Sequence, residues 1–183
     1  SLGLGKDVVV ITNPVIKKSH GRVLREGLIG AGHTVKFIEV PSGEDSKSAD
    51  TVFDVVGKIV SYSAQKDLMI VAFGGGVVGD LAGFIAATYR RGIPYIQVPT
   101  TFLAQVDSAI GGKTAIDLPV GKNLIGAFYQ PKLVWSDVNV LRTLDDRQIK
   151  NGLAEAIKYG VICDRSLFRY LERDYQNILA RDP

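Results

Sequence analysis

An apolar strand that runs into a glycine-rich turn and then a helix is the feature that most constrains the fold of this chain. Residues 67–73 (DLMIVAF) form the most apolar strand-like run, and Gly74, Gly76 and Gly79 follow at the spacing G-x-G-x-x-G. A helix is expected over about residues 77–89. A continuous apolar strand indicates a strand that is covered on both faces, as in a parallel sheet.

The same alternation of strand and helix runs through the first half of the chain. Apolar or alternating runs predict strands over residues 8–12, 34–40, 67–73 and 95–99. Helical spacing of apolar residues fills the segments between them, over residues 15–30, 46–63 and 77–89. This order predicts a Rossmann-like α/β fold, a parallel sheet with helices on both faces.

The second half of the chain has a looser pattern. Residues 100–131 predict a long irregular segment, which in a compact domain is usually functional or wrongly assigned. Residues 132–137 predict one more strand, and Thr143 with Asp146 predicts a capping box before helices that continue to residue 183. The abrupt start at a strand, and an end without a closing element, are expected of a piece of a longer protein.

Composition excludes several classes of protein. The 183 residues are 46% hydrophobic and 22% charged, which is ordinary for a globular protein and excludes general disorder. A net charge of +3 without a run of basic residues argues against a nucleic-acid partner. We expect neither a membrane span nor a signal peptide. The single Cys163 cannot form an internal disulfide, so a cytoplasmic location is the default expectation.

The glycine turn has two interpretations. Glycines at this position let a pyrophosphate approach the backbone, where the N–H groups of a helix N-terminus favour negative charge. The acidic ribose ligand usually found about twenty residues later is missing, because Ile96 stands there. The alternative is a tight strand-to-helix turn that needs glycine only for close packing.

Charged residues cluster after the fourth predicted strand. Gly111-Gly112-Lys113-Thr114 resembles the end of a P-loop, but Asp107 stands where a P-loop needs glycine, so ATP hydrolysis is not supported. Asp107, Lys113 and the Lys122-Asn123 pair can bind an anionic, polyhydroxylated ligand. The alternative is that these are solvated loop charges.

The predicted helix over residues 145–159 has two distinct faces. The apolar face carries Ile149, Leu153, Ala156 and Ile157, and the polar face carries Gln148, Asn151, Glu155 and Lys158. Glu155 and Lys158 are helical neighbours, which fits either an exposed ion pair or a metal ligand or acid/base group beside an anion-binding lysine. His20 and His33 have no metal-ligand spacing, and Cys163 lies in an apolar stretch and is expected to be structural.

Five blocks in order closely resemble the 3-dehydroquinate synthase family. They are GGGVVGD at 74–80, PTT at 99–101, GGKT at 111–114, GKNLIGAF at 121–128 and AEAIK at 154–158. The resemblance implies an NAD-binding α/β domain over residues 1–142. It also implies that residues 143–183 are the first helices of a helical domain for metal and substrate. Two of the family's three zinc ligands are histidines outside this chain, which leaves Glu155.

The resemblance also implies an activity. The family is a cytoplasmic lyase of the shikimate pathway and aromatic amino acid biosynthesis, with NAD and a divalent metal, zinc or cobalt, and it forms homodimers. It converts a seven-carbon keto-deoxy sugar acid phosphate (DAHP) to 3-dehydroquinate and phosphate. The steps are a transient NAD-dependent oxidation, phosphate elimination, re-reduction and an intramolecular aldol cyclisation. Oxidation at C5 acidifies the neighbouring C6 proton, which makes the elimination feasible.

Site residues carry over from the family's motifs position by position. The implied NAD contacts are Glu44, Lys47, Gly75, Gly76, Val77, Asp80, Thr100, Thr101, Lys122, Thr143 and Leu144. The implied catalytic or substrate contacts are Asp107, Lys113, Asn123 and Lys158, with Glu155 as metal ligand. Arg91 resembles an arginine that reaches the substrate phosphate across a dimer interface.

Three alternatives to this function remain open. A sugar-phosphate cyclase with another substrate is the nearest, although the GGKT block favours 3-dehydroquinate synthase. A metal-dependent polyol dehydrogenase is the second, and it differs by releasing NADH. The third is a non-catalytic NAD-binding module, because without the histidines this chain is expected to bind zinc weakly and not to turn over.

Overall fold

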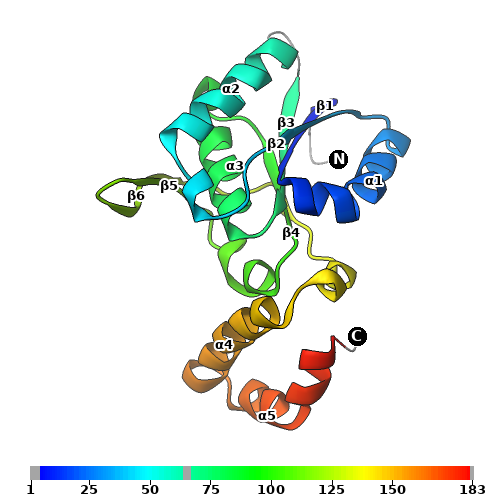
Figure 1. Cartoon of the computed structure of the whole chain (residues 1–183), viewed down its shortest axis with the longest axis vertical. Coiled ribbons are helices and arrows are strands. Elements are labelled where there is room, and N and C mark those ends of the chain that lie inside the picture. The colour runs from blue at the N-terminus through cyan, green and yellow to red at the C-terminus, as the bar shows by residue number, and fades with distance from the viewer. Residues whose placement is uncertain (1–4, 64–66, 182–183) are drawn as a thin grey trace.

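A five-stranded parallel sheet forms the centre of the molecule (Figure 1). The computed structural model describes residues 5–63 and 67–181. The strand order is β2-β1-β3-β4-β7, and every neighbouring pair is parallel. The strands are β1 (Asp7–Thr12), β2 (Thr34–Glu39), β3 (Leu68–Gly74), β4 (Tyr95–Pro99) and β7 (Leu133–Val134). The predicted Rossmann-like parallel sheet is therefore confirmed.

Helices cover both faces of this sheet, as predicted (Figure 1). Side chains of α2 (Ala49–Ser63) and α3 (Gly76–Thr88) pack with alternate strand residues on one face, and α1 (Pro14–Gly30) covers the other. All seven residues of β3 are buried, because this strand lies at the centre of the sheet and between the helical layers. The apolar run that marked β3 in the sequence reflects this double coverage.

The prediction of an irregular segment over residues 100–131 is wrong. This stretch contains a π-helical turn, η3 (Ala104–Ser108), and an antiparallel hairpin of β5 (Lys113–Leu118) and β6 (Gly121–Phe128). The hairpin projects away from the body of the molecule beyond α2 and α3 (Figure 1). Most residues of β6 are exposed, so its sequence lacks the alternation of apolar and polar residues that marks a half-buried strand.

Short elements connect the sheet to the C-terminal helices and to the site. They are the 3-10 turns η1 (Glu44–Ser46), η2 (Tyr89–Arg91) and η4 (Val138–Thr143). The strand expected over residues 132–137 is present only as β7, which has two residues. The predicted capping role of Thr143 is wrong: its hydroxyl donates to the Val140 carbonyl within η4, and Asp145 caps the next helix by accepting from the Gln148 amide.

The C-terminal part is helical, as expected. Helix α4 (Asp146–Ile162) packs on α5 (Arg165–Ala180), and residues 182–183 lie outside the described residues. Two expectations about α4 are wrong: Ile157 is exposed rather than part of the apolar face, and Cys163 is exposed rather than structural. Ile157 therefore lies outside the buried stripe of α4, and Cys163 is the C-cap residue that follows the helix.

Within residues 5–63 and 67–181, the helices are too short or too polar to cross a lipid bilayer.

Candidate functional site

The site forms where the carboxyl ends of the central strands meet the start of α3. β3 ends at Gly74, and Gly75 is the N-cap of α3 without any side-chain cap. The first N–H groups of this helix are therefore not satisfied by a capping side chain, and the helix dipole adds partial positive charge at the same place. This arrangement favours an anion such as a phosphate.

Each glycine of the turn also makes close packing possible. A Cβ on Gly75 would lie 3.0 Å from the Thr101 methyl, and a Cβ on Gly76 would lie 2.8 Å from the Ser108 hydroxyl. A Cβ on Gly79 would lie 2.8 Å from the side-chain oxygen of Gln97 in β4. The chain thus needs small residues here for packing, which confirms the packing interpretation, and the anion-binding interpretation of the motif stays a prediction.

Buried hydroxyl groups without a protein partner flank the turn. Thr12 ends β1 and Thr100 follows β4, the two strands on either side of β3, and they are 0% and 1% exposed. Among the described residues, neither hydroxyl oxygen has a hydrogen-bond partner, and the same is true of Ser108 in η3. Because buried polar groups are normally satisfied, these oxygens fit a polar ligand that lies along the carboxyl edge of the sheet.

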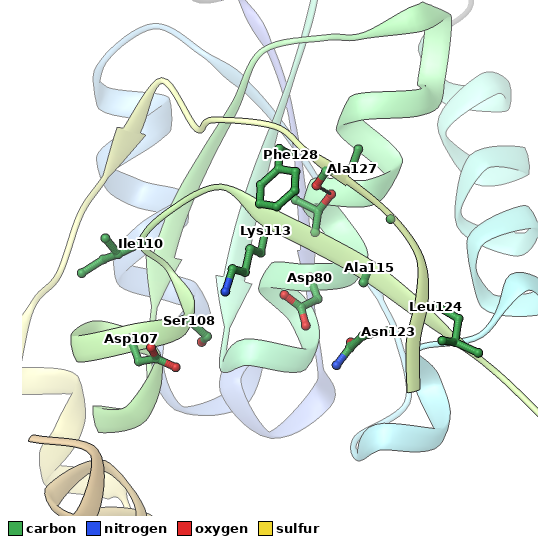
Figure 2. A pocket seen from close by; sticks show the side chains of 12 residues that line it. Asp80, Asp107, Ser108, Ile110, Lys113, Ala115, Asn123, Leu124, Ala127 and Phe128 are labelled. Atoms are coloured by element: carbon green, nitrogen blue, oxygen red, sulfur yellow. Dashed lines mark hydrogen bonds between the residues drawn. The ribbon is translucent and has the colours of Figure 1, made fainter. Parts of the chain in front are cut away.

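A cavity of about 520 Å³ lies beside the glycine turn (Figure 2). Its charged side chains are Asp80 from α3, Asp107 from η3 and Lys113 from the hairpin, and its neutral polar ones are Ser108, Thr114 and Asn123. The hairpin also supplies an apolar wall made of Ala115, Leu124, Ala127 and Phe128. Of the predicted substrate residues, the structure therefore brings Asp107, Lys113 and Asn123 together.

A buried lysine connects this cavity to the loop before α2. The side chain of Lys47 is only 3% exposed, and its Nζ donates to Asp80 Oδ2 at 2.8 Å and to Asn123 Oδ1 at 2.5 Å. Glu44 Oε1 and Asp117 Oδ1 lie 3.6 and 3.8 Å from the same nitrogen. One ammonium group thus joins the glycine-turn helix, η1 and the hairpin.

The charge state of Lys47 follows from these neighbours. Burial acts to lower the pKa of Lys47, but the hydrogen bond to Asp80 and the carboxylates of Glu44 and Asp117 outweigh it and raise the pKa above 10.5. Lys47 is therefore a cation at every physiological pH. The cluster has net negative charge, because three carboxylates, those of Glu44, Asp80 and Asp117, outnumber two ammonium groups. The second ammonium group belongs to Lys122, whose Nζ lies 3.7 Å from Glu44 Oε1.

Helix α4 reaches the cavity through a tyrosine. The Tyr159 hydroxyl donates to Asp107 Oδ1 at 2.7 Å, which fixes the carboxylate of a cavity residue from the C-terminal helices. This hydrogen bond is the main reason that the pKa of Tyr159 lies above its ordinary value of 10.0. This contact could not be predicted from local sequence patterns, because the two residues are 52 positions apart.

We expect Tyr159 to titrate above pH 10, and the tie between α4 and η3 to weaken as it does. Because the raised pKa belongs to the folded state, the stabilising contribution is complete below the ordinary value and is lost as pH rises through the higher value. The difference in tyrosinate absorbance between the chain and a Tyr159→Phe variant isolates this group. Asp107→Asn should lower the midpoint, and an unchanged midpoint would contradict the assigned cause.

Glu155 does not lie among the cavity-lining residues. Its carboxylate pairs with the ammonium of Lys158 on the same helix, with side chains 21% and 50% exposed. Over residues 5–63 and 67–181, no three His, Cys, Asp or Glu side chains come together as a metal site. The described residues thus supply fewer than three side-chain ligands to any one metal. Helix α4, which carries Glu155, contacts η3 beside the glycine turn, but the closeness of Glu155 itself to that turn stays a prediction.

The remaining predicted residues lie outside the cavity. Arg91 follows the C-terminal end of α3, whereas the cavity adjoins its N-terminal end, so Arg91 does not join the site of its own chain. Arg90 and Arg91 both have positive φ, 52° and 66°. Thr143 lies 3.0 Å from His20 Nε2, and Leu144 is buried beside it.

Several residues of this site were not predicted from the sequence. Thr12, Ser108, Asp117 and Tyr159 each contribute a polar group, but none belongs to a charged pair or glycine motif that stands out in the sequence. Thr12 was the one of these residues that could have been found, because it ends a predicted strand and the carboxyl ends of parallel strands form the ligand-binding edge of a sheet.

The chain is similar in sequence to a known protein family. The family described as 3-dehydroquinate synthase N-terminal matches residues 37–151. The 3-dehydroquinate synthase of Geotalea uraniireducens (strain Rf4) is 51% identical over 179 residues, 98% of this chain and 50% of that protein. The chain thus spans about half the length of the curated relatives it matches.

Two solved structures share the fold and more than a quarter of the sequence. ValA (2-epi-5-epi-valiolone synthase) from Streptomyces hygroscopicus subsp. jinggangensis 5008, with NAD+ and Zn2+ bound, has a TM-score of 0.91 at 30% identity, covering 98% of this chain and 51% of that one. A 2-deoxy-scyllo-inosose synthase complexed with carbaglucose-6-phosphate, NAD+ and Co2+ has a TM-score of 0.82 at 33% identity, covering 88% and 44%. On these matches, the chain belongs to the 3-dehydroquinate synthase family.

Proposed function

We propose that this chain binds NAD+ along the carboxyl edge of its sheet and forms the cofactor-binding part of a 3-dehydroquinate synthase. The observation that carries the proposal is the uncapped glycine turn at the start of α3, flanked by the unpartnered buried hydroxyls of Thr12 and Thr100. A diphosphate on the helix N-terminus, with sugar hydroxyls beside those oxygens, satisfies both features. The NAD+ in the two related structures supports this assignment.

The cofactor contacts follow from this placement. Gly75, Gly76 and Val77 offer backbone N–H groups to the diphosphate. Glu44 and Lys47 lie next to Asp80 and take the place of the ribose ligand that the glycine motif lacks downstream. The remaining proposed NAD contacts are Thr100, Thr101, Lys122, Thr143 and Leu144.

The cavity next to the turn is the proposed substrate site. The side chains of Lys113, Asp80, Asp107 and Asn123 lie around it, and a lysine suits the phosphate or carboxylate of DAHP as a point charge (Figure 2). Asp107, held by Tyr159, accepts hydrogen bonds from substrate hydroxyls or a proton during the reaction. Lys158 lies on the helix that carries Tyr159 and supplies a second cation, while Arg91 acts in the site of a partner subunit.

The proposed reaction is conversion of DAHP to 3-dehydroquinate and phosphate. Bound NAD+ supplies a reversible hydride acceptor, so the reaction has no net redox change. The residues of this chain hold one substrate in place through oxidation, elimination, re-reduction and cyclisation, which is the positional part of catalysis. Cations at the phosphate stabilise the leaving group.

Glu155 is proposed as one ligand of a divalent metal, zinc or cobalt. It needs further ligands from outside the described residues, since these contain no group of three metal-binding side chains. We therefore assign no step of the reaction to the metal. Release of Glu155 from Lys158 is required before it can bind one.

The domain organisation and assembly belong to the same proposal. Residues 1–142 are the NAD-binding α/β domain, and residues 143–183 begin a helical domain for metal and substrate. The proposed protein is a cytoplasmic homodimer. Arg91 lies away from the cavity of its own chain, which fits a role in the site of a partner subunit.

We expect NAD+ to stabilise the chain in a thermal-shift titration. A ligand that binds only the folded state at 100 times its dissociation constant adds about 2.7 kcal/mol to the free energy of unfolding. NADP+ is the matched probe, because the Glu44 carboxylate repels a 2′-phosphate, and it should shift the midpoint much less. Equal shifts with both nucleotides would contradict the role of Glu44, and no shift with NAD+ would contradict the cofactor site.

Activity separates the proposed enzyme from its alternatives. A form of the protein that spans the full length of its relatives should release phosphate from DAHP with catalytic amounts of NAD+. Accumulation of NADH would instead indicate a polyol dehydrogenase. Turnover of another sugar phosphate but not DAHP would indicate a different cyclase, and NAD+ binding without any turnover would indicate a binding module.

A further inference from the structure

The hairpin that walls the cavity has an irregularity at Asp117. Strands β5 and β6 pair regularly from Lys113 with Phe128 to Ile116 with Ile125, but Leu118 then pairs with Gly121. Asp117 alone therefore lies opposite residues 122–124. Such bulges redirect side chains, and they occur often near functional sites.

Asp117 holds the irregular part of the hairpin in place. Its Oδ1 accepts a hydrogen bond from the Asn123 backbone N–H at 2.7 Å, and Asn123 has a φ of 57°. This left-handed conformation is uncommon for a residue with a side chain, although asparagine tolerates it better than most, and a hydrogen bond to the backbone N–H gives it local support. The Asp117 carboxylate supplies that support, so the side-chain direction of Asn123 depends on it.

The same residue fixes the loop that carries Lys47. The Asp117 backbone N–H donates to the Lys47 carbonyl at 2.7 Å, and the Asp117 carboxylate lies 3.8 Å from Lys47 Nζ. Asn123 Oδ1 in turn accepts from Lys47 Nζ. Asp117 is absent from the cavity lining, and its side chain contacts Asn123 and Lys47, so we expect its effect on a ligand to act through these two residues.

We propose that Asp117 is a positioning residue that sets the geometry of Asn123 and Lys47 for ligand binding. The inference rests on the proposed NAD+ and substrate site. In it, Asp117 acts by placing its acceptor oxygen Oδ1 at the Asn123 backbone N–H, and not by its negative charge. Its side chain is 18% exposed, and Lys47 keeps Asp80 and Glu44 as carboxylate partners if the charge at position 117 is removed.

Three substitutions separate position from charge. Asp117→Asn keeps an acceptor oxygen at the same place without charge, whereas Asp117→Glu keeps the charge and moves it by one methylene. Asp117→Ala removes both. We expect the Asn variant to bind NAD+ within about threefold of the unmodified chain, and the Glu and Ala variants to bind about tenfold more weakly, as expected for loss of a hydrogen-bonded support.

Calorimetric titration with NAD+ and two-dimensional amide NMR spectra of the 183-residue chain test this order. The Asn123 amide proton should keep its position in Asp117→Asn and shift upfield in the Glu and Ala variants. Asp54→Ala, which removes an exposed carboxylate paired with Lys58 on α2, is the matched control and should change neither measurement. If the Ala variant does not fold, the Asn and Glu variants carry the comparison.

The outcomes distinguish this inference from the proposed function. If the unmodified chain does not bind NAD+, the proposed function fails, and the amide resonance still decides whether Asp117 positions Asn123. If NAD+ binds but the Glu variant binds as tightly as the unmodified chain, or the Asn variant loses affinity as the Ala variant does, the positioning role is overturned.

Discussion

Lys47→Met is expected to lower the free energy of unfolding by about 2–3 kcal/mol and to abolish measurable NAD+ binding. Methionine fills much of the same volume but leaves Asp80 and Asn123 without their donor. Removing one partner of a fully buried pair costs about 3–5 kcal/mol, and the lower figure applies because the Asp80 and Asp117 side chains are 23% and 18% exposed. Urea unfolding and NAD+ titration measure the two effects.

Lys58→Met is the matched control for this variant. Lys58 pairs with Asp54 at 2.7 Å, but its side chain is 50% exposed, so the pair is solvated and contributes little. We expect stability within about 0.5 kcal/mol of the unmodified chain. Equal losses in the two variants would show that burial of Lys47 is not what makes it important.

Gly152→Ala is expected to destabilise the chain by about 1–3 kcal/mol, although alanine is normally the better helix former. A Cβ at this position of α4 would lie 2.5 Å from Phe102 Cγ and 2.6 Å from Phe102 Cβ. Rotation of the Phe102 side chain moves Cγ but leaves Cβ in place, so a change of rotamer cannot relieve the contact. Helix α4 has to shift instead, which also disturbs the Tyr159–Asp107 hydrogen bond.

Gly27→Ala provides the contrasting result. Gly27 lies in the exposed part of α1, and a Cβ there meets nothing within 4 Å. We expect this variant to be more stable by about 0.5–1 kcal/mol, because alanine loses less conformational entropy in a helix. Thermal unfolding of both variants measures the difference, and destabilisation in both would rule out the Phe102 contact as the cause.

Local patterns predicted the parallel sheet well. β1, β3 and β4 were found within a residue or two of their bounds, because strands buried on both faces need unbroken apolar runs. The hairpin over residues 113–128 was missed for the opposite reason, since most of β6 is exposed, β5 is only partly buried, and neither strand has a continuous apolar run. Asp145 replaced Thr143 as the cap of α4, because Thr143 is used inside η4.

The candidate site divides in the same way. The glycine turn and the polar residues Asp107, Lys113 and Asn123 were visible as motifs, and the last three do line one cavity. The buried environment of Lys47 and the link from Tyr159 to Asp107 were not visible, because each depends on residues more than thirty positions away. Glu155 was singled out correctly as a neighbour of Lys158, but its metal role stays a prediction.

The sequence by itself determined the alternation of strands and helices, and with it the edge of the sheet where a ligand can bind. Periodicity and turn chemistry act over a few residues, so they can be read without knowledge of the fold. Only the tertiary structure decided which polar groups meet at that edge. Burial and ion pairing depend on segments that are distant along the chain, as when Asp80, Asn123 and Asp117 gather around one buried ammonium group.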